Sequence, residues 1–233
     1  MKILAVGMNY AAHNKELNET LLPKEPVIFS KPDSAILRTG KPFFVPDFAE
    51  RFDYEAELVV RISRLGKDVS ERFAHRYYDA VTVGIDFTAR DLQAKLRSEG
   101  LPWELCKGFD NSAALGTLIP KTELFDIPGC TSVAQEWKPS KKGGTHISEA
   151  CWQSLIQDIR FRLDIDGKTV QQGHTADMMF SVDQIVSYVS RFITLKTGDL
   201  LFTGTPVGVG PVHEGQTLKG YLGEKEVLNV NIR

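Results

Sequence analysis

Several features that would restrict the function are scarce or missing from this sequence. There are 3 cysteines among 233 residues, and they have neither the even number of a disulfide framework nor the spacing of a thiolate metal site. No apolar run is long enough to span a bilayer, and the apolar stretch at residues 3–6 is too short for a signal peptide. These absences predict a soluble, cytoplasmic protein with reduced thiols.

An excess of positive charge is also missing. Lys and Arg number 28 against 30 Asp and Glu, which gives a net charge of -2, so no basic surplus is available to bind nucleic acid or an anionic membrane. The glycine-rich turn at residues 203–210 lacks the Gly-Lys-Ser/Thr ending of a phosphate loop, which argues against nucleotide binding. We therefore expect neither a nucleic-acid nor a membrane partner.

What is present is an ordinary globular composition, with 42% hydrophobic and 25% charged residues. Strand-like patterns dominate and are punctuated by Gly and Pro, which predicts an α+β fold that is mostly β. No internal repeat is found, and the length favours one domain over residues 1–233. The predicted strands are residues 3–6, 27–30, 54–62, 81–87, 161–165, 200–203 and 227–232.

Helical patterns are fewer, and each begins near a residue that can cap it. Ser70 is expected to open a helix that runs to residue 80, and Ser181 one that ends near residue 190. Thr88 is expected to cap a helix over residues 89–99, with Gly100 supplying the stop.

Residues 126–157 are the least regular stretch and are predicted to be a surface insertion. They contain a Pro-Gly pair, a run rich in Lys and Gly, and a short amphipathic patch near Trp152. The simpler interpretation is a solvated basic loop. The alternative is a lid or a subunit contact that carries lysines toward an anionic substrate, and the sequence does not decide between the two.

Residues 54–62, with the sequence YEAELVVRI, place two carboxylates on one face of a strand. Because side chains alternate along a strand, Glu55 and Glu57 project together, about 7 Å apart along the chain, while the apolar residues face the core. An acidic outer face would give the same pattern. Asp86 favours a site, because an acid at the end of an apolar strand is costly to bury without a partner. Three carboxylates suit Mg²⁺ or Mn²⁺, whereas zinc would draw His or Cys ligands.

A histidine and a glutamate near the amino terminus have a spacing that suits acid–base chemistry. His13 and Glu16 are three residues apart, so on a helical turn they share a face. A carboxylate bonded to one imidazole nitrogen raises the basicity of the other, so the pair could draw a proton from water. A surface His–Glu contact is the commoner origin of such a spacing.

The predicted helix at residues 89–99 carries Arg90, Gln93 and Arg97 on one face. A solvated helix face would give the same arrangement for the two arginines. Lys107, which is followed by Gly-Phe, can offer a cation to a carboxylate or an enolate.

The glycine-rich turn that begins at residue 203 is the last candidate for binding. It contains Gly204 and Thr205 directly after a predicted strand. Its backbone amides and the Thr205 hydroxyl can hold a carboxylate.

Together these motifs resemble the fumarylacetoacetate hydrolase family, and the resemblance covers nearly the whole chain. It implies an α+β fold, mostly β, in a single catalytic domain that usually forms a homodimer. It also implies that Glu55, Glu57 and Asp86 bind Mg²⁺ or Mn²⁺. The signatures are residues 7–10 (GMNY) with His13 and Glu16, Lys31-Pro32, Glu55 to Leu58, residues 86–91, Lys107 to Phe109, and Gly204 to Pro206.

Within the family, residues 88–93 (TARDLQ) followed by residues 100–103 (GLPW) are most similar to the acylpyruvate hydrolase and oxaloacetate decarboxylase subgroup. By that likeness His13 and Glu16 lie on a mobile lid and activate water. Lys107 is then a further catalytic residue. The residues expected to bind the substrate are Arg90, Gln93, Gly204 and Thr205.

The resemblance predicts an enzyme that hydrolyses a C–C bond in acylpyruvate-type 2-oxo acids and that can also decarboxylate oxaloacetate. An isomerase or decarboxylase of 2-hydroxy-dienedioate intermediates is the alternative enzyme. A metal- or carboxylate-binding module without catalysis is the alternative from a different class.

Overall fold

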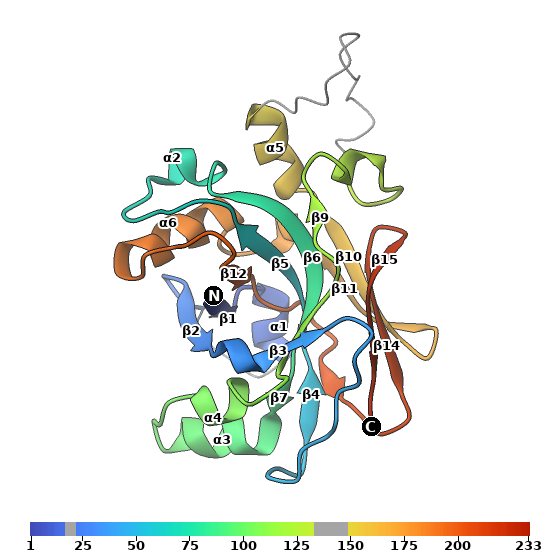
Figure 1. Ribbon diagram of the computed structural model, residues 1–233. Coiled ribbons are helices and arrows are strands. Elements are labelled where there is room, and N and C mark those ends of the chain that lie inside the picture. Colours follow the sequence, from blue (N-terminus) through green and yellow to red (C-terminus); the bar gives the residue numbers. More distant parts are fainter. Residues whose placement is uncertain (17–21, 133–148) are drawn as a thin grey trace.

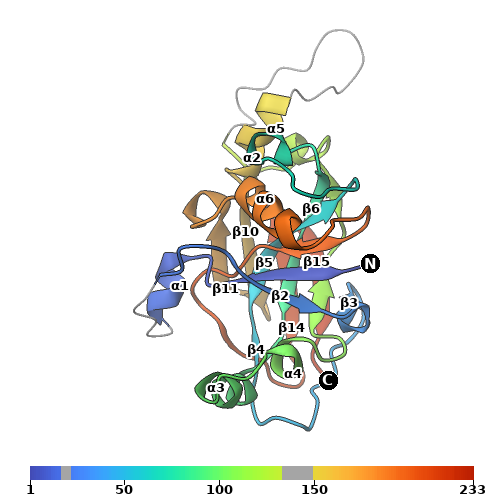
Figure 2. The same cartoon turned by 90° about the vertical axis from the view of Figure 1, so that its left-hand side faces the viewer.

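The computed structural model describes residues 1–16, 22–132 and 149–233, and within the first helix it describes side chains as far as His13. Helices α3 and α4 lie at one end of the molecule and α5 at the opposite end, with the strands between them (Figures 1 and 2). The helices are α1 Ala11–Glu16, α2 Glu71–Ala74, α3 Arg90–Ser98, α4 Glu104–Lys107, α5 Glu149–Ile156 and α6 Val182–Phe192, with short 3₁₀ turns at Asp33–Ala35, Leu124–Asp126 and Thr175–Asp177.

The described strands form three sheets, and the largest has eight strands. Its main path runs β2-β1-β12-β5-β6-β8-β3, and β9 pairs with β6. These strands are β1 Ile3–Gly7, β2 Val27–Lys31, β3 Ile36–Arg38, β5 Ala56–Ile62, β6 Tyr78–Asp86, β8 Ala113–Leu115, β9 Ile119–Pro120 and β12 Leu200–Phe202.

The second sheet is antiparallel, in the order β11-β10-β14-β15, and the third is a small one in the order β13-β4-β7. The mostly β, mixed fold that the sequence predicts is confirmed. The strands of these two sheets are β10 Arg160–Ile165, β11 Lys168–His174, β14 Thr217–Leu222 and β15 Lys225–Asn231, and then β4 Phe52–Tyr54, β7 Thr88–Ala89 and β13 Gly210–Pro211.

The second sheet packs closely on the centre of the largest one. A Cβ atom added to Gly220 of β14 would lie 2.9 Å from Cγ1 of Val83 in β6, so the two backbones approach as only a glycine allows. Val83 and Ile85 are fully buried between the layers. The contact lies against the part of β6 that ends at Asp86, where the candidate site begins.

Two of the helix predictions need correction. The helix expected over residues 70–80 ends at Ala74, because the chain enters β6 at Tyr78 and pairs with β5 instead. Thr88 does not cap α3: the capping position is Ala89, without a side-chain bond. The Thr88 hydroxyl accepts a hydrogen bond from Lys107 instead, which makes it part of the site.

The strand predicted over residues 54–62 is divided into β4 and β5, and Glu55 lies at the break. Gly100 adopts a positive φ of 67° directly after α3 and its C-cap, so the predicted stop is confirmed. All three cysteines are free, as expected for reduced thiols.

The predicted insertion at residues 126–157 falls partly on residues 133–148, which lie outside the described part of the chain. Its basic loop therefore stays a prediction. The two described ends are packed: Ile127 and Cys130 are buried on one side, and Trp152 is fully buried on the other. Among the described residues, no helix is both long and apolar enough to cross a membrane.

Helix α6 begins at the predicted residue and has a capping box. The Ser181 hydroxyl accepts a hydrogen bond from the amide of Gln184 at 3.2 Å, and the Gln184 side chain accepts one from the amide of Ser181 at 2.9 Å. The helix buries Val182, Ile185 and Val189 against the core. The cap fixes the first turn, and the apolar face fixes the side that is buried.

Replacing Ser181 by alanine is expected to lower the free energy of unfolding by about 1 kcal/mol, because the amide of Gln184 loses its acceptor at the helix start. Urea denaturation followed by circular dichroism measures this change. Ser181→Thr keeps a hydroxyl and serves as the control. An alanine variant as stable as the parent protein would contradict the role of the cap.

Candidate metal centre

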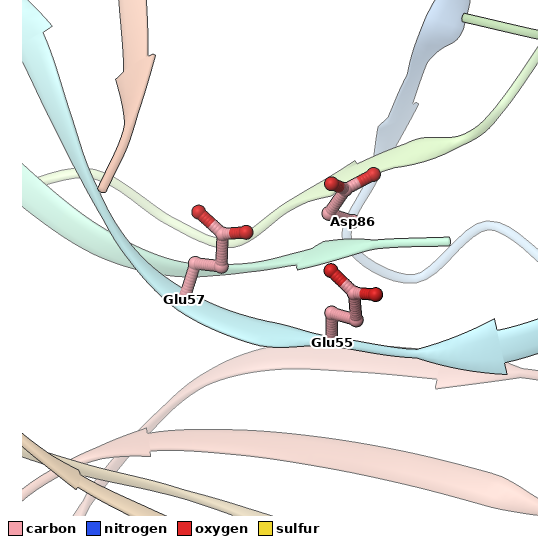
Figure 3. A group of neighbouring side chains, drawn as sticks. All are labelled: Glu55, Glu57 and Asp86. Atoms are coloured by element: carbon pink, nitrogen blue, oxygen red, sulfur yellow. The ribbon is translucent and has the colours of Figure 1, made fainter. Parts of the chain in front are cut away.

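Three carboxylates meet at the place where β5 and β6 pair. Ala56 lies opposite Ile85 in this antiparallel pair, and the amide of Asp86 donates to the carbonyl of Glu55 at 2.9 Å. Asp86 therefore faces Glu55 across the pair, and Glu57 follows two residues along the same face. Figure 3 shows the three side chains pointing toward one another from these neighbouring segments.

One carboxylate oxygen from each of the three residues Glu55, Glu57 and Asp86 lies within 4.8 Å of the other two, and all three residues are buried. Buried carboxylates at this separation repel unless a cation lies among them. The donor set consists of oxygens alone, which suits Mg²⁺ or Mn²⁺ rather than zinc. The residues present therefore fit a hard divalent cation.

The ionisation of the glutamates agrees with a cation site. Burial, and then the charges of Asp86 and Glu55, raise the pKa of Glu57 well above its usual range. Burial opposes ionisation of Glu55 as well, yet Lys107 and Arg90 lower its pKa. A divalent ion among the three carboxylates would favour the charged form of Glu57 too, because it would offset the repulsion from its neighbours.

Lys107 extends from the end of α4 into the carboxylate group. Its Nζ donates to Glu55 at 2.8 Å, to Asp86 at 2.7 Å and to the Thr88 hydroxyl at 2.6 Å. Burial opposes its charge, but Asp86 and Glu55 outweigh that effect and raise the pKa of Lys107. A charged ammonium group thus lies beside the predicted metal ligands, as expected for a group that stabilises negative charge on a substrate.

Arg90 at the start of α3 is held by three acceptors. It donates to Asp53 at 2.8 Å, to Glu55 at 2.5 Å and to the side-chain oxygen of Gln93 at 2.6 Å. These contacts exclude the simple solvated helix face, and they place Arg90 and Gln93 next to Glu55. Both residues line the same cavity as the three carboxylates.

The turn after β12 also contacts the site through Gly204. Its amide donates to Glu57 at 2.7 Å and so holds a predicted metal ligand, while its contact with a substrate stays a prediction. Gly204 has a φ of 97°, and a Cβ atom there would lie 2.7 Å from Cβ of Asn9. Any larger residue would push this amide away from Glu57.

Thr205 lies between β5 and β11. Its hydroxyl donates to the carbonyl of Ala56 at 2.9 Å and accepts from the Gln171 amide at 2.9 Å. The oxygen of the same Gln171 side chain accepts from the amide of Ala56 at 2.9 Å. Thr205 lines the cavity, and Gln171 fixes the orientation of its hydroxyl.

His13 is buried in α1 and lines the cavity together with the carboxylates. The charge of His13 is also among the influences that lower the pKa of Glu55. The side chain of Glu16 lies outside the described residues, so its pairing with His13 stays a prediction.

Two charged residues of the site were missing from the predicted set. Lys31, at the end of β2, lies 2.5 Å from Asp86 and donates to the carbonyl of Ser112 at 3.1 Å. Asp53 in β4 accepts from Arg51 and Arg90. Lys31 belongs to a motif that the family resemblance had already included, whereas Asp53 belongs to no such motif.

The chain is similar in sequence and in fold to proteins of known name. Residues 2–233 match the family model described as the C-terminal part of fumarylacetoacetate hydrolase. The mitochondrial oxaloacetate tautomerase of Arabidopsis thaliana is 37% identical over 227 residues, which cover 97% of this chain and 88% of the relative.

Two solved structures share the fold. Fumarylpyruvate hydrolase from Pseudomonas aeruginosa, crystallised with Mn²⁺ and pyruvate, superposes with a TM-score of 0.79 and 32% identity, covering 100% of this chain and 89% of that one. The 5-carboxymethyl-2-hydroxymuconate delta-isomerase from Mycobacterium smegmatis gives a TM-score of 0.75 and 30% identity, covering 99% and 78%. All three relatives are enzymes, and their names give three different reactions.

Proposed function

This chain belongs to the fumarylacetoacetate hydrolase family, and we propose that it is a divalent-metal-dependent enzyme that converts small 2-oxo acids through their enolates. The observation that carries the proposal is the meeting of Glu55, Glu57 and Asp86 within 4.8 Å, with the Lys107 ammonium group beside them. Relatives of similar sequence catalyse different reactions, so the other residues of the cavity distinguish among the candidates.

The three carboxylates would hold Mg²⁺ or Mn²⁺. When bound, such an ion supplies a Lewis acid for the carboxylate and 2-oxo oxygens of the substrate. Lys107 adds a positive charge next to Glu55 and Asp86, where negative charge develops on the substrate as the enolate forms. Lys31 pairs with one carboxylate oxygen of Asp86, and Lys107 pairs with the other.

Proton transfer is assigned to His13, the histidine that lines the cavity. In the keto–enol tautomerisation of oxaloacetate, it would move a proton between the carbon beside the 2-oxo group and solvent. The oxaloacetate tautomerase with 37% identity supports this reaction.

Hydrolysis of an acylpyruvate is the second candidate, and the burial of His13 in the cavity favours it. In this reaction His13, supported by Glu16, would draw a proton from water that attacks the distal carbonyl, and the pyruvate part would leave as its enolate. The similarity to fumarylpyruvate hydrolase supports this candidate. Decarboxylation of oxaloacetate gives the same enolate without an attacking water.

The remaining parts of the proposal concern compartment and assembly. We propose a cytoplasmic homodimer that acts on a small molecule, consistent with the family resemblance and with a net charge of -2. Exposed apolar side chains such as Phe44, Leu105 and Phe192 offer surface for contact between subunits.

Removal of divalent metal is expected to lower the turnover of every substrate below about 1% of the Mg²⁺ or Mn²⁺ value, because the Lewis acid is lost. The assay compares oxaloacetate, acetylpyruvate and a 2-hydroxy-dienedioate, each with metal and with chelator, by following enol absorbance. Restored turnover after metal is returned is the control for damage to the protein.

The pattern across the panel separates the candidate reactions. Full activity in chelator would contradict the metal-dependent mechanism. Tight metal binding without turnover of any 2-oxo acid would favour a non-catalytic binding module, and preference for the dienedioate would favour an isomerase.

A further inference from the structure

Lys31 is a buried lysine whose contacts are all with the protein itself. Its side chain is fully buried, and it does not line the cavity that the three carboxylates share. Its Nζ lies 2.5 Å from Oδ1 of Asp86, and it donates to the hydroxyl and the carbonyl of Ser112 at 3.1 Å each and to the carbonyl of Lys107. An ammonium group has only three N–H donors, so these partners leave none for a substrate.

The two oxygens of Asp86 are divided between two lysines. Lys31 lies against Oδ1, while Lys107, which does line the cavity, donates to Oδ2 at 2.7 Å. Charged donors that are themselves fixed in place set the orientation of a carboxylate. Asp86 is therefore held with Oδ1 on the side of the buried Lys31 and Oδ2 on the side of the cavity.

The two glutamates of the site are held in a similar way. Oε1 of Glu55 accepts from Arg90 at 2.5 Å, and Oε2 of Glu57 accepts from the amide of Gly204 at 2.7 Å. Each of the three carboxylates thus has one oxygen bound by an arginine, a lysine or a backbone amide. Single oxygens suit Mg²⁺, which requires a near-ideal octahedron, whereas Ca²⁺ takes more oxygens and often binds both oxygens of a carboxylate.

We propose that Lys31 is a positioning residue that withholds Oδ1 of Asp86 from the cation, so that Asp86 binds through one oxygen and the site selects Mg²⁺ over Ca²⁺. This inference rests on the proposed function, which supplies the metal. It gives Lys31 an effect on the choice of metal through Asp86, without contact with the substrate.

The test compares the affinities of Mg²⁺ and Ca²⁺, each measured by displacement of Mn²⁺ that is followed by electron paramagnetic resonance. In Lys31→Met the ratio of the Ca²⁺ affinity to the Mg²⁺ affinity is expected to rise about tenfold, because Oδ1 becomes available as a further ligand. Loss of a positive charge strengthens the binding of both ions, so the ratio isolates the effect on coordination. Lys31→Gln keeps an N–H donor without the charge and should retain part of the selectivity of the parent protein.

Lys2→Met is the matched control. Lys2 also lies 2.5 Å from a buried aspartate, Asp199, but neither residue lines the cavity. This variant removes the same charge and the same kind of ion pair, and we expect it to keep the ratio of the parent protein.

An unchanged ratio in Lys31→Met would overturn the inference. A crystal structure of the Mn²⁺-loaded parent protein provides a second test that does not depend on the folding of any variant. We expect Asp86 to bind the ion through Oδ2 with Lys31 still on Oδ1, and coordination through Oδ1 or through both oxygens would contradict the proposal. Failure of the parent protein to bind Mn²⁺ would instead contradict the proposed function, so the two failures are distinguishable.

Discussion

Asp86→Asn is expected to lower kcat/KM at least about a thousandfold for every 2-oxo acid that the parent protein converts, because one of the three proposed metal ligands would lose its charge. Asparagine has nearly the same shape, so the packing around it is preserved. Mn²⁺ binding measured by electron paramagnetic resonance should weaken in parallel. The loss of activity then has a physical cause that can be measured without substrate.

The fold is expected to survive this change. Asp86 forms ion pairs with Lys31 and Lys107, and Lys107 keeps Glu55 as a second acidic partner when Asp86 is neutralised. Asp79→Asn is the matched control, because Asp79 lies on the same strand and pairs with Arg61 far from the site. Wild-type Mn²⁺ affinity in the Asp86 variant would show that the carboxylate is not a ligand.

His13→Ala is expected to reduce hydrolysis of acetylpyruvate by a factor of about a hundred to ten thousand, the usual contribution of a positioned acid–base group. Tautomerisation of oxaloacetate should fall as well, because a proton must be moved. Decarboxylation of oxaloacetate should change little, since the loss of carbon dioxide gives the enolate without an attacking water. The three reactions are followed in the same metal-loaded preparation.

Two further variants sharpen this result. Glu16→Gln should lower hydrolysis in the same direction as the His13 variant but by less, because the glutamate acts through the imidazole. His213→Gln changes an exposed histidine and serves as the control. Unchanged turnover of acetylpyruvate in His13→Ala would rule out this residue as the base.

The strands and the third helix show how much of the fold local pattern can predict. The apolar runs that became β1, β6 and β12 were identified from composition alone, and Ser181 was correctly placed as the start of α6. The prediction that the helix from Ser70 reaches residue 80 was wrong. The helix ends at Ala74, because the chain from Tyr78 onward pairs with β5. Helical propensity is weak compared with a long-range strand contact that buries Tyr78.

Some residues of the site were also predictable from local pattern, whereas others depend on tertiary contacts. The two-residue repeat of a strand placed Glu55 and Glu57 on one face, and helical spacing paired His13 with Glu16. Lys107 was a candidate cation, and the family likeness assigned it a catalytic role. Asp53 escaped detection, because its importance comes only from its contact with Arg90, which is 37 residues away in the chain. The amide of Gly204 donates to Glu57, a contact that the sequence did not predict, and its binding to substrate stays a prediction.

The sequence by itself predicted an acidic strand face, an acid at residue 86 that is costly to bury, and an oxygen-donor metal that would join them. It could not determine that they meet, because alternation along a strand is a local property, whereas the neighbour across a sheet depends on pairing register. The antiparallel register of β5 and β6 sets Asp86 opposite Glu55 and buries both with Glu57. That burial excludes the water that would otherwise screen the three charges, and so only the tertiary structure turns an acidic strand into a site that fits a cation.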